Sequence, residues 1–297
     1  LECNFNASGD TVISAGHLMW LASQTLDPVM KKHLDRNLYV WFAPSAGRRY
    51  LISADVARGD GRDHSAFHVF DAQSMDQVAE YYGKIPVEDY ARLLCETGHE
   101  YGTAMLAVEN TSVGLACLEH IRLLGYENVY YSRRGDHKPG ESVNTTWGNI
   151  DPELVPGFTT SQKNRPLMIS KLEEFIRNRS ISIRSKRMYE ELRTFIWNNG
   201  KPEAAKGSND DLVMAGSIGA WIRDTYLAPN FVTVDIQKKM LSGIDMNKIT
   251  NNQINGASKD PRDIPRISSG IYPTGGQSPT QMRLPRGKTI DFSWLYK

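Results

Sequence analysis

Cysteine is scarce in this 297-residue chain, and long hydrophobic runs are missing. Its three cysteines, Cys3, Cys95 and Cys117, are widely spaced and include no CxxC pair, which argues against a disulfide framework and a zinc knuckle. No stretch approaches the roughly 18 uninterrupted apolar residues of a membrane helix. The start, LECNFNASGD, lacks the basic-then-apolar order of a signal peptide. We therefore expect a cytoplasmic protein that does not bind a membrane.

A large excess of either charge is also lacking, because the net charge is only +1. The charges are nevertheless segregated: residues 132–206 contain 14 Lys and Arg against 9 Asp and Glu, and residues 230–297 contain 10 against 5. Such segregation suits a protein that presents a basic face to phosphates and gathers its carboxylates elsewhere. Solvated surfaces and a basic tail would give the same counts, so charge alone does not decide between these interpretations.

Short apolar runs and helical periodicity alternate along the middle of the chain. The expected strands are residues 50–55, 65–71, 78–84, 105–109 and 129–131, and the expected helices follow Pro86 and span 115–124, 167–177, 188–197 and 212–226. The first three strands form an economical antiparallel meander, after which helix, strand, helix and strand alternate. This order predicts an α/β fold of the RNase H-like (RuvC-like) type, a mixed sheet with flanking helices.

The chain divides into three parts by its sequence pattern. Residues 1–48 read as a connector with an extended segment and a short helix, and residues 49–229 contain the predicted α/β domain. Within that domain, residues 133–164 are rich in Gly, Pro, Asn and Thr and too long for a plain connection, which predicts a functional loop or small hairpin. From 230 to 297 the periodicity ends, and we expect a largely irregular tail.

Four acidic residues stand where a sheet and a helix can bring them together. Asp55 and Glu109 each end an apolar strand, and the carboxyl ends of neighbouring parallel strands meet at one edge of a sheet. Asp210 and Asp211 open a helix after residues that can cap it, so a carboxylate is presented from a rigid first turn. Acids from three anchored elements are what a magnesium site requires.

Such a site is suited to phosphodiester hydrolysis. The reaction requires a water to lose a proton near neutral pH and the leaving oxygen to be neutralised, and two hard cations about 3.5–4 Å apart can do both. Hard cations prefer oxygen ligands, and the His and Cys patterns expected for zinc are absent. Asp63, which follows the turn-forming Gly59 and Gly61, is a candidate auxiliary ligand, although an ordinary turn aspartate would look the same.

Four segments carry a resemblance to a known family. YLISADVARGDGRDHSAFHVFD, AVENTSVG, GFTTSQKNRPLMISKLEEFI and SNDDLVMA resemble, in that order, the nuclease part of large terminase subunits from tailed phages, especially those of the T-even-like branch. The likeness covers most of residues 1–226, and ECNFNASGDTVI resembles the end of the family's ATPase part and its linker. The chain contains no GxxxxGKS or GxxxxGKT loop to bind ATP phosphates, so we assign neither ATP hydrolysis nor DNA translocation to it.

The resemblance implies an endonuclease that cuts double-stranded, concatemeric viral DNA during genome packaging, with little sequence specificity. The family's catalytic carboxylates fall on Asp55, on Glu109 and on one of Asp210 and Asp211, of which Asp211 is favoured. Asp63 and Asp210 are further candidate metal ligands. The expected cofactors are two Mg²⁺ or Mn²⁺ ions. The implied partners are DNA, the capsid portal protein and the small terminase subunit, in the host cytoplasm on the procapsid.

A nuclease with little sequence specificity gains its affinity from Lys and Arg side chains on phosphates. Basic residues near the predicted loops and the later helices are the candidates: Arg133, Arg134, Lys138, Lys163, Arg165, Lys201 and Lys206. Lys206, close to the acidic pair, could also stabilise charge on the scissile phosphate. Plain solvation is the competing interpretation for each of them.

Other functions remain open from the sequence. A RuvC-like resolvase or a transposase uses the same carboxylate chemistry, but a resolvase prefers four-way junctions and a transposase joins strands. A non-catalytic portal-docking module would use its acids to bind structural metal or to cap helices. Its function would survive the replacement of Asp55 by alanine.

Overall fold

The computed structural model of the chain describes residues 11–59, 61, 63–133 and 153–227, together with the backbone of three short strands outside these ranges. The chain divides into two compact units, residues 1–235 and 236–297. In the second unit the described residues form an antiparallel hairpin of β12 (Gln281–Arg283) and β13 (Thr289–Asp291). The rest of the predicted irregular tail lies outside the described residues.

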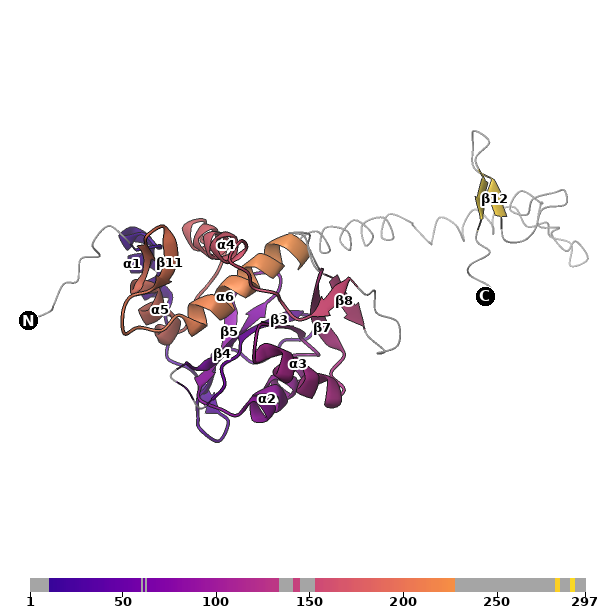
Figure 1. The fold of residues 1–297 in the computed structure, drawn as a ribbon, viewed down its shortest axis with the longest axis horizontal. Coiled ribbons are helices and arrows are strands. Elements are labelled where there is room, and N and C mark those ends of the chain that lie inside the picture. The colour runs from indigo at the N-terminus through magenta and orange to yellow at the C-terminus, as the bar shows by residue number, and fades with distance from the viewer. Residues whose placement is uncertain are drawn as a thin grey trace, which may run out of the picture. The chain divides into compact units, whose positions relative to one another are not determined.

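A mixed sheet forms the centre of the first unit (Figure 1). Its strand order is β1 (Met30–Lys32), β2 (Leu38–Val40), β5 (Gln77–Gly83), β4 (Ser65–Asp71), β3 (Tyr50–Asp55), β6 (Met105–Val108), β7 (Asn128–Arg133) and β8 (Glu141–Asn144), with β9 (Leu154–Pro156) also paired to β7. Strands β3, β4 and β5 form an antiparallel meander, whereas β6 and β7 continue the sheet parallel to β3. This is the RNase H-like arrangement that the order of elements predicts.

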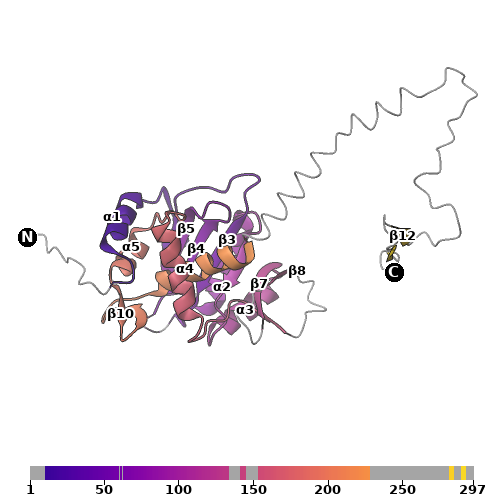
Figure 2. The same ribbon diagram turned by 90° about the horizontal axis from the view of Figure 1, so that it is seen from above.

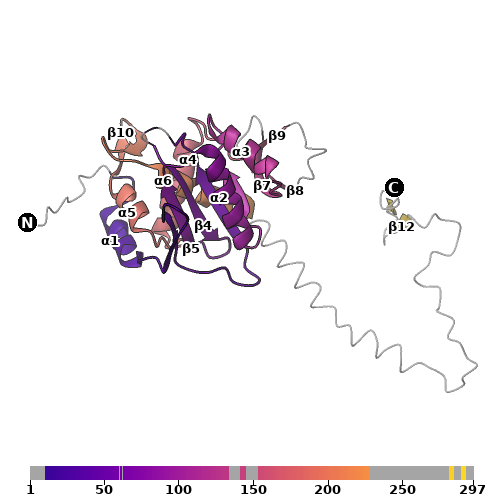
Figure 3. The ribbon, with the colours of Figure 1, turned by 90° about the horizontal axis from the view of Figure 1, so that it is seen from below.

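Helices cover both faces of the sheet (Figure 2, Figure 3). One face carries α2 (Val87–Glu100) and α3 (Gly114–Leu123), and the other carries α4 (Arg165–Arg177), α5 (Lys186–Arg193) and α6 (Asp211–Ile222), with α1 (Ala15–Gln24) packed against α5. Because both faces are covered, β3 and β4 are buried along nearly their whole length instead of at alternate positions. None of the described helices is both long and apolar enough to cross a membrane.

Helix α6 lies directly on the sheet because glycines stand where it meets β3 and β4. A Cβ atom on Gly219 would lie 2.8 Å from Ser53 Oγ and 3.0 Å from the Phe70 ring, so glycine allows the helix to approach β3 and β4 closely. The residues of α6 from Leu212 to Ala220 are all buried. Close packing of this kind fixes the start of α6, at Asp211, relative to the carboxyl end of β3.

Two parts of the first unit differ from the sequence expectation. Residues 30–40 add β1 and β2 to the sheet, although their short runs predict a connector. The helix predicted over 188–197 ends at Arg193, and β10 (Phe195–Asn198) pairs instead with β11 (Lys201–Ala204). The reason is the Asn199–Gly200 turn, whose residues both have positive φ, 50° and 76°, as a two-residue hairpin requires.

Candidate active site

Asp55 and Glu109 lie side by side at the carboxyl ends of two parallel strands. The register of β3 and β6 pairs Ala54 with Val108, and the Glu109 amide donates to the Ala54 carbonyl over 2.9 Å. The Tyr90 hydroxyl of α2 donates to the Ala66 carbonyl over 2.8 Å and lies 3.1 Å from the Asp55 carbonyl oxygen, which places it at the end of β3. The backbone therefore fixes both acids at one edge of the sheet.

The pKa of Asp55 depends on its burial and on the neighbouring acids. Burial raises the pKa of Asp55 well above its usual range, and Glu109 adds to the shift through its charge and through a hydrogen bond between the two side chains. The charges of Asp211 and Asp210 act in the same direction, so the four residues form one acidic cluster. Repulsion between buried acids is typical of functional sites, and a bound cation would relieve it.

The two adjacent aspartates at the start of α6 have different partners. Asp211 Oδ2 accepts hydrogen bonds from the His64 amide at 3.2 Å and from Asn209 Nδ2 at 3.4 Å. Burial raises the pKa of Asp211 to about 6. Asp210 instead pairs with Arg165, whose Nη2 lies 2.6 Å from Asp210 Oδ2. Asp211 is therefore held by neutral donors, whereas Asp210 is paired with the Arg165 guanidinium.

Asp63 lies close enough to Asp211 for its charge to raise the pKa of that residue further. The chain turns back before Asp63 at Gly59, which has a φ of +82° and where a Cβ atom would lie 2.3 Å from the Ile85 carbonyl oxygen. The Asp63 side chain is exposed. Its assignment as an auxiliary ligand stays a prediction.

The donor chemistry of the acidic cluster fits a hard divalent cation. Asp55, Glu109 and Asp211 offer carboxylate oxygens from three separate elements, and their mutual repulsion favours positive charge between them. In the part of the chain that the structure describes, no three Asp, Glu, His or Cys side chains already converge as a coordination shell. The ligand assignments therefore stay predictions, which the placement of the carboxylates supports.

The backbone around Glu109 is held from two sides. The Asn110 amide donates to the Phe158 carbonyl over 2.9 Å, and Asn110 Nδ2 donates to Thr159 Oγ1 over 2.9 Å. On the other side, Gly114 at the start of α3 approaches so closely that a Cβ atom there would lie 1.8 Å from the Glu109 carbonyl oxygen. Both contacts fix the direction in which the Glu109 side chain leaves the sheet.

We expect Gly114→Ala to lower the free energy of unfolding by about 1–3 kcal/mol, because the added methyl group meets a backbone carbonyl that cannot rotate away. Equilibrium chemical denaturation measures this change. Gly16→Ala is the matched control, since Gly16 lies in the first turn of α1 with nothing within 4 Å of the added Cβ. The control should be neutral or slightly stabilising. Equal stability of the two variants would contradict the close approach at Glu109.

Sequence patterns miss several residues that surround the acids. Asn209 Nδ2 also donates to the Tyr82 hydroxyl over 2.9 Å, and the His64 ring stacks on Tyr82 with 4.4 Å between the ring centroids. His64 and Asn209 are adjacent in sequence to Asp63 and Asp210, and that position beside a candidate acid is a signal that could have identified them. Tyr82 lies in β5 and has no such signal.

The predicted DNA-binding residues differ in whether they contact the acidic cluster. Arg165 joins the acidic cluster through Asp210, whereas Arg133 at the end of β7 pairs with Glu153 at 3.6 Å. Lys163, Lys201 and Lys206 are exposed, and Arg134 and Lys138 lie outside the described residues. Arg165 is therefore the predicted basic residue for which the structure gives a direct contact with the acids.

A cavity of about 590 Å³ opens between the loops that follow β3 and β6 and the starts of α2 and α3. It is lined in part by Arg58 and Ser112, which each follow one of the strand-end acids by three residues, and by His120 of α3. The N-terminal ends of α2 and α3 also reach it and contribute partial positive charge. Glu88, at the start of α2, is its acidic lining residue. The cavity offers an anion several cationic or hydrogen-bonding groups.

No protein-family profile matches the chain, and no curated protein sequence matches it. Solved structures do. The large terminase nuclease of the thermophilic phage G20c with bound magnesium matches with a TM-score of 0.53 and 17% identity, over 72% of this chain and 97% of that chain. Its structure with bound cobalt matches with a TM-score of 0.50 and 17% identity, over 68% and 95% of the two chains. The large terminase nuclease domain of Thermus phage P74-26 matches with a TM-score of 0.50 and 18% identity, over 68% and 93%. This chain therefore has the fold of the large terminase nuclease domains.

Proposed function

We propose that the chain is a divalent-metal-dependent endonuclease that cuts double-stranded, concatemeric viral DNA during genome packaging. The observation that carries the proposal is that Asp55 and Glu109 lie side by side at the ends of β3 and β6, near enough to Asp211 for its charge to act on Asp55. The shared fold supports it, because the G20c large terminase nuclease has been solved with bound magnesium and with bound cobalt.

In this proposal the three carboxylates hold two Mg²⁺ or Mn²⁺ ions, with Asp63 as an auxiliary ligand. When bound, such ions lower the pKa of an attacking water and neutralise charge on the phosphate. Asp55 and Glu109 are rigid because their backbones are held by the sheet and by the contacts of Asn110 and Gly114. Rigid ligands hold the reacting phosphate in one orientation, which is a large part of the catalytic gain in phosphoryl chemistry.

Arg165 has a separate role in the proposal. Asp210 holds its guanidinium at the acidic cluster, while about a third of the Arg165 side chain, 34%, remains exposed. A guanidinium has donors to spare after one carboxylate contact and can reach a phosphate oxygen with another. Arg165 therefore binds the DNA strand beside the cut, and Asp210 orients Arg165.

We propose that the DNA backbone binds in the cavity at the starts of α2 and α3. Arg58 and His120 offer cationic or donor groups, Ser112 offers a hydroxyl, and two helix N-termini favour phosphate in the same space. These contacts carry no base preference, which suits an enzyme with little sequence specificity.

We expect Arg58→Ala to weaken duplex binding several-fold at moderate salt and to reduce the slope of log affinity against log salt by about 1. The measurement is a salt titration of binding in an Asp55→Asn background, so that the DNA stays intact. Arg193→Ala is the control, because Arg193 pairs with Glu190 on α5, away from the cavity. If both changes weaken binding equally, the DNA backbone does not bind in the cavity.

The same proposal extends to the setting of the reaction. We propose that the protein acts in the host cytoplasm on the procapsid, with the capsid portal protein and the small terminase subunit as partners. The supporting observation is the fold shared with large terminase nucleases.

Cleavage assays on three substrates test the proposed function. With Mg²⁺ or Mn²⁺ we expect cutting of linear duplex and plasmid DNA at many sites, and no cutting in EDTA. Strong preference for a four-way junction would identify a resolvase, and strand joining would identify a transposase. No cutting of any substrate with either metal would favour a non-catalytic docking module.

A further inference from the structure

The N-terminus of α6 lacks a cap from its own sequence. The side chain of the N-cap residue Asp210 makes no capping hydrogen bond and pairs with Arg165 instead. Asn209, the residue before it, donates to Tyr82 and Asp211. The first amide groups of an α-helix have no partner within the helix and need another acceptor when they are buried.

Glu191 of α5 supplies the missing cap. Its Oε2 accepts hydrogen bonds from the Leu212 amide at 2.9 Å and from the Val213 amide at 3.1 Å. Glu191 is only 9% exposed, so these bonds form away from bulk water. The cap thus comes from another helix, which leaves the side chains of Asp210 and Asp211 available to the acidic cluster.

His68 of β4 holds the same turn from the sheet. Its Nδ1 accepts from Gln77 Nε2 at 2.7 Å, which leaves Nε2 as the protonated nitrogen that donates to the Leu212 carbonyl over 2.9 Å. Burial lowers the pKa of His68, in agreement with this neutral form. The amide and the carbonyl of Leu212, the residue after Asp211, are therefore both bonded to buried side chains.

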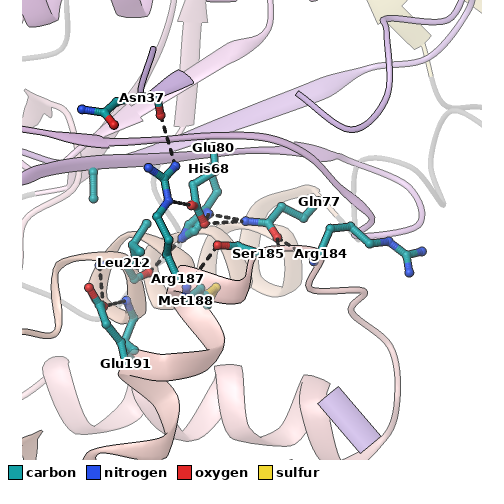
Figure 4. A network of polar contacts seen from close by, with 12 residues as sticks. Asn37, His68, Gln77, Glu80, Arg184, Ser185, Arg187, Met188, Glu191 and Leu212 are labelled. Atoms are coloured by element: carbon teal, nitrogen blue, oxygen red, sulfur yellow. Dashed lines mark hydrogen bonds and ion pairs between the residues drawn. The ribbon is translucent and has the colours of Figure 1, made fainter. Parts of the chain in front are cut away.

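The two contacts belong to one buried network, which Figure 4 shows from close by. Gln77 Oε1 accepts from the backbone amides of Arg184 at 2.7 Å and Ser185 at 2.9 Å, and Ser185 caps α5. Glu80 of β5 binds Arg187 Nε at 2.8 Å. These bonds attach the start of α5 to β5 and thereby set the position of Glu191 later in the same helix.

We propose that Glu191 and His68 are positioning residues that hold the first turn of α6 so that the Asp211 carboxylate is directed at the metal site. The inference rests on the proposed function, because it assigns Asp211 a cation. It adds a physical reason why the site binds that cation tightly. The buried partners of Leu212 reduce the number of directions in which the Asp211 side chain can point, so less conformational freedom is lost on binding. Partners that orient ligands in this way are typically responsible for a 10–100-fold change in metal affinity.

The test compares Glu191→Leu, Glu191→Gln and His68→Phe in the full chain. Binding of Mn²⁺ alone is followed by titration calorimetry, and hydrogen exchange of residues 210–214 is followed in the absence of metal. Glu191→Leu should weaken Mn²⁺ binding roughly 10–100-fold and His68→Phe several-fold, with faster exchange in this turn. Glu191→Gln retains an acceptor for both amides and should bind Mn²⁺ within about threefold of the native chain.

Tyr101→Phe is the control for a general loss of stability. It removes a buried hydrogen bond, from the Tyr101 hydroxyl to the Phe42 carbonyl at 2.8 Å, on the face of the sheet opposite α6. It should lower stability without changing Mn²⁺ affinity or exchange in residues 210–214. If Glu191→Leu and His68→Phe behave like this control, the positioning role is wrong.

The same measurements separate this inference from the proposed function. If the native chain binds no Mn²⁺ and cuts no DNA, the proposed function fails. Hydrogen exchange of residues 210–214 then decides whether Glu191 and His68 hold the first turn of α6. Faster exchange in the variants supports this role, and unchanged exchange contradicts it. If the native chain binds Mn²⁺ and the variants bind it equally well, only the positioning role fails.

Discussion

Replacing Asp55 with asparagine is expected to abolish DNA cleavage and, at the same time, to make the metal-free protein more stable. The cleavage rate should fall on the order of 10³-fold or more, because a charged metal ligand is lost from the centre of the reaction. Stability should rise because burial and the neighbouring Glu109 make the ionised form of Asp55 unfavourable in the folded chain. Cleavage with Mg²⁺ and thermal unfolding in EDTA measure both effects on one preparation.

The gain in stability has a predicted pH dependence. The pKa of Asp55 is higher in the folded chain than in the unfolded chain, so the native chain loses stability as the pH rises through the folded-state value. Asparagine does not ionise. The advantage of the variant should therefore be small below about pH 4, the usual pKa of an unfolded aspartate, and should grow as the pH rises.

Asp27→Asn is the matched control for both effects. Asp27 is 85% exposed and pairs with Lys186, far in sequence from the acidic cluster. Its replacement should leave both the cleavage rate and the stability nearly unchanged, as is usual for exposed ion pairs. An Asp55→Asn variant that is inactive but less stable than the native chain would contradict the electrostatic account of the site.

Asp211→Asn and Asp210→Asn are expected to differ strongly, although the residues are adjacent. Asp211→Asn should lower the cleavage rate on the order of 10³-fold, because we assign Asp211 to the cation. Asp210→Asn should lower it by roughly tenfold, because the change releases Arg165 without removing a ligand. The measurement is the single-turnover cleavage rate at saturating Mg²⁺.

A double variant tests the role of Arg165 in the same assay. Arg165→Gln should lower the rate at least as much as Asp210→Asn, because it also removes the proposed phosphate contact, and adding Asp210→Asn to it should cause little further loss. An Asp210→Asn variant as inactive as Asp55→Asn, together with an active Asp211→Asn variant, would reverse the roles of the two aspartates.

The sheet and the placement of its acids follow from local sequence patterns. β3 and β6 are short apolar runs because both strands are buried on two faces. Each run is followed by an acid, since the side chains at the end of the sheet are only half-buried. Asp210 and Asp211 precede a long apolar helix, which is why they can be assigned to its first turn. These patterns suffice to place Asp55 and Glu109 side by side, since parallel neighbouring strands end together, whereas the position of Asp211 depends on how α6 packs on the sheet.

The supporting contacts do not follow from local patterns, because they join residues far apart in the chain. Glu191 binds the amides of Leu212 and Val213, and His68 binds the carbonyl of Leu212 across 144 positions. The end of α5 is a different case. The Asn199–Gly200 pair is a local hairpin signal, and weighing it against the helical spacing of 188–197 would have predicted β10 and β11.

The most direct test of the account is cleavage of linear duplex DNA by the native chain and by Asp55→Asn, each with Mg²⁺ and with EDTA, after thermal unfolding has shown that both are folded. The native chain should cut with Mg²⁺ and not in EDTA, and folded Asp55→Asn should cut in neither. Cutting by the native chain in EDTA, undiminished cutting by Asp55→Asn, or no cutting by the native chain with Mg²⁺ would contradict the carboxylate-centred nuclease.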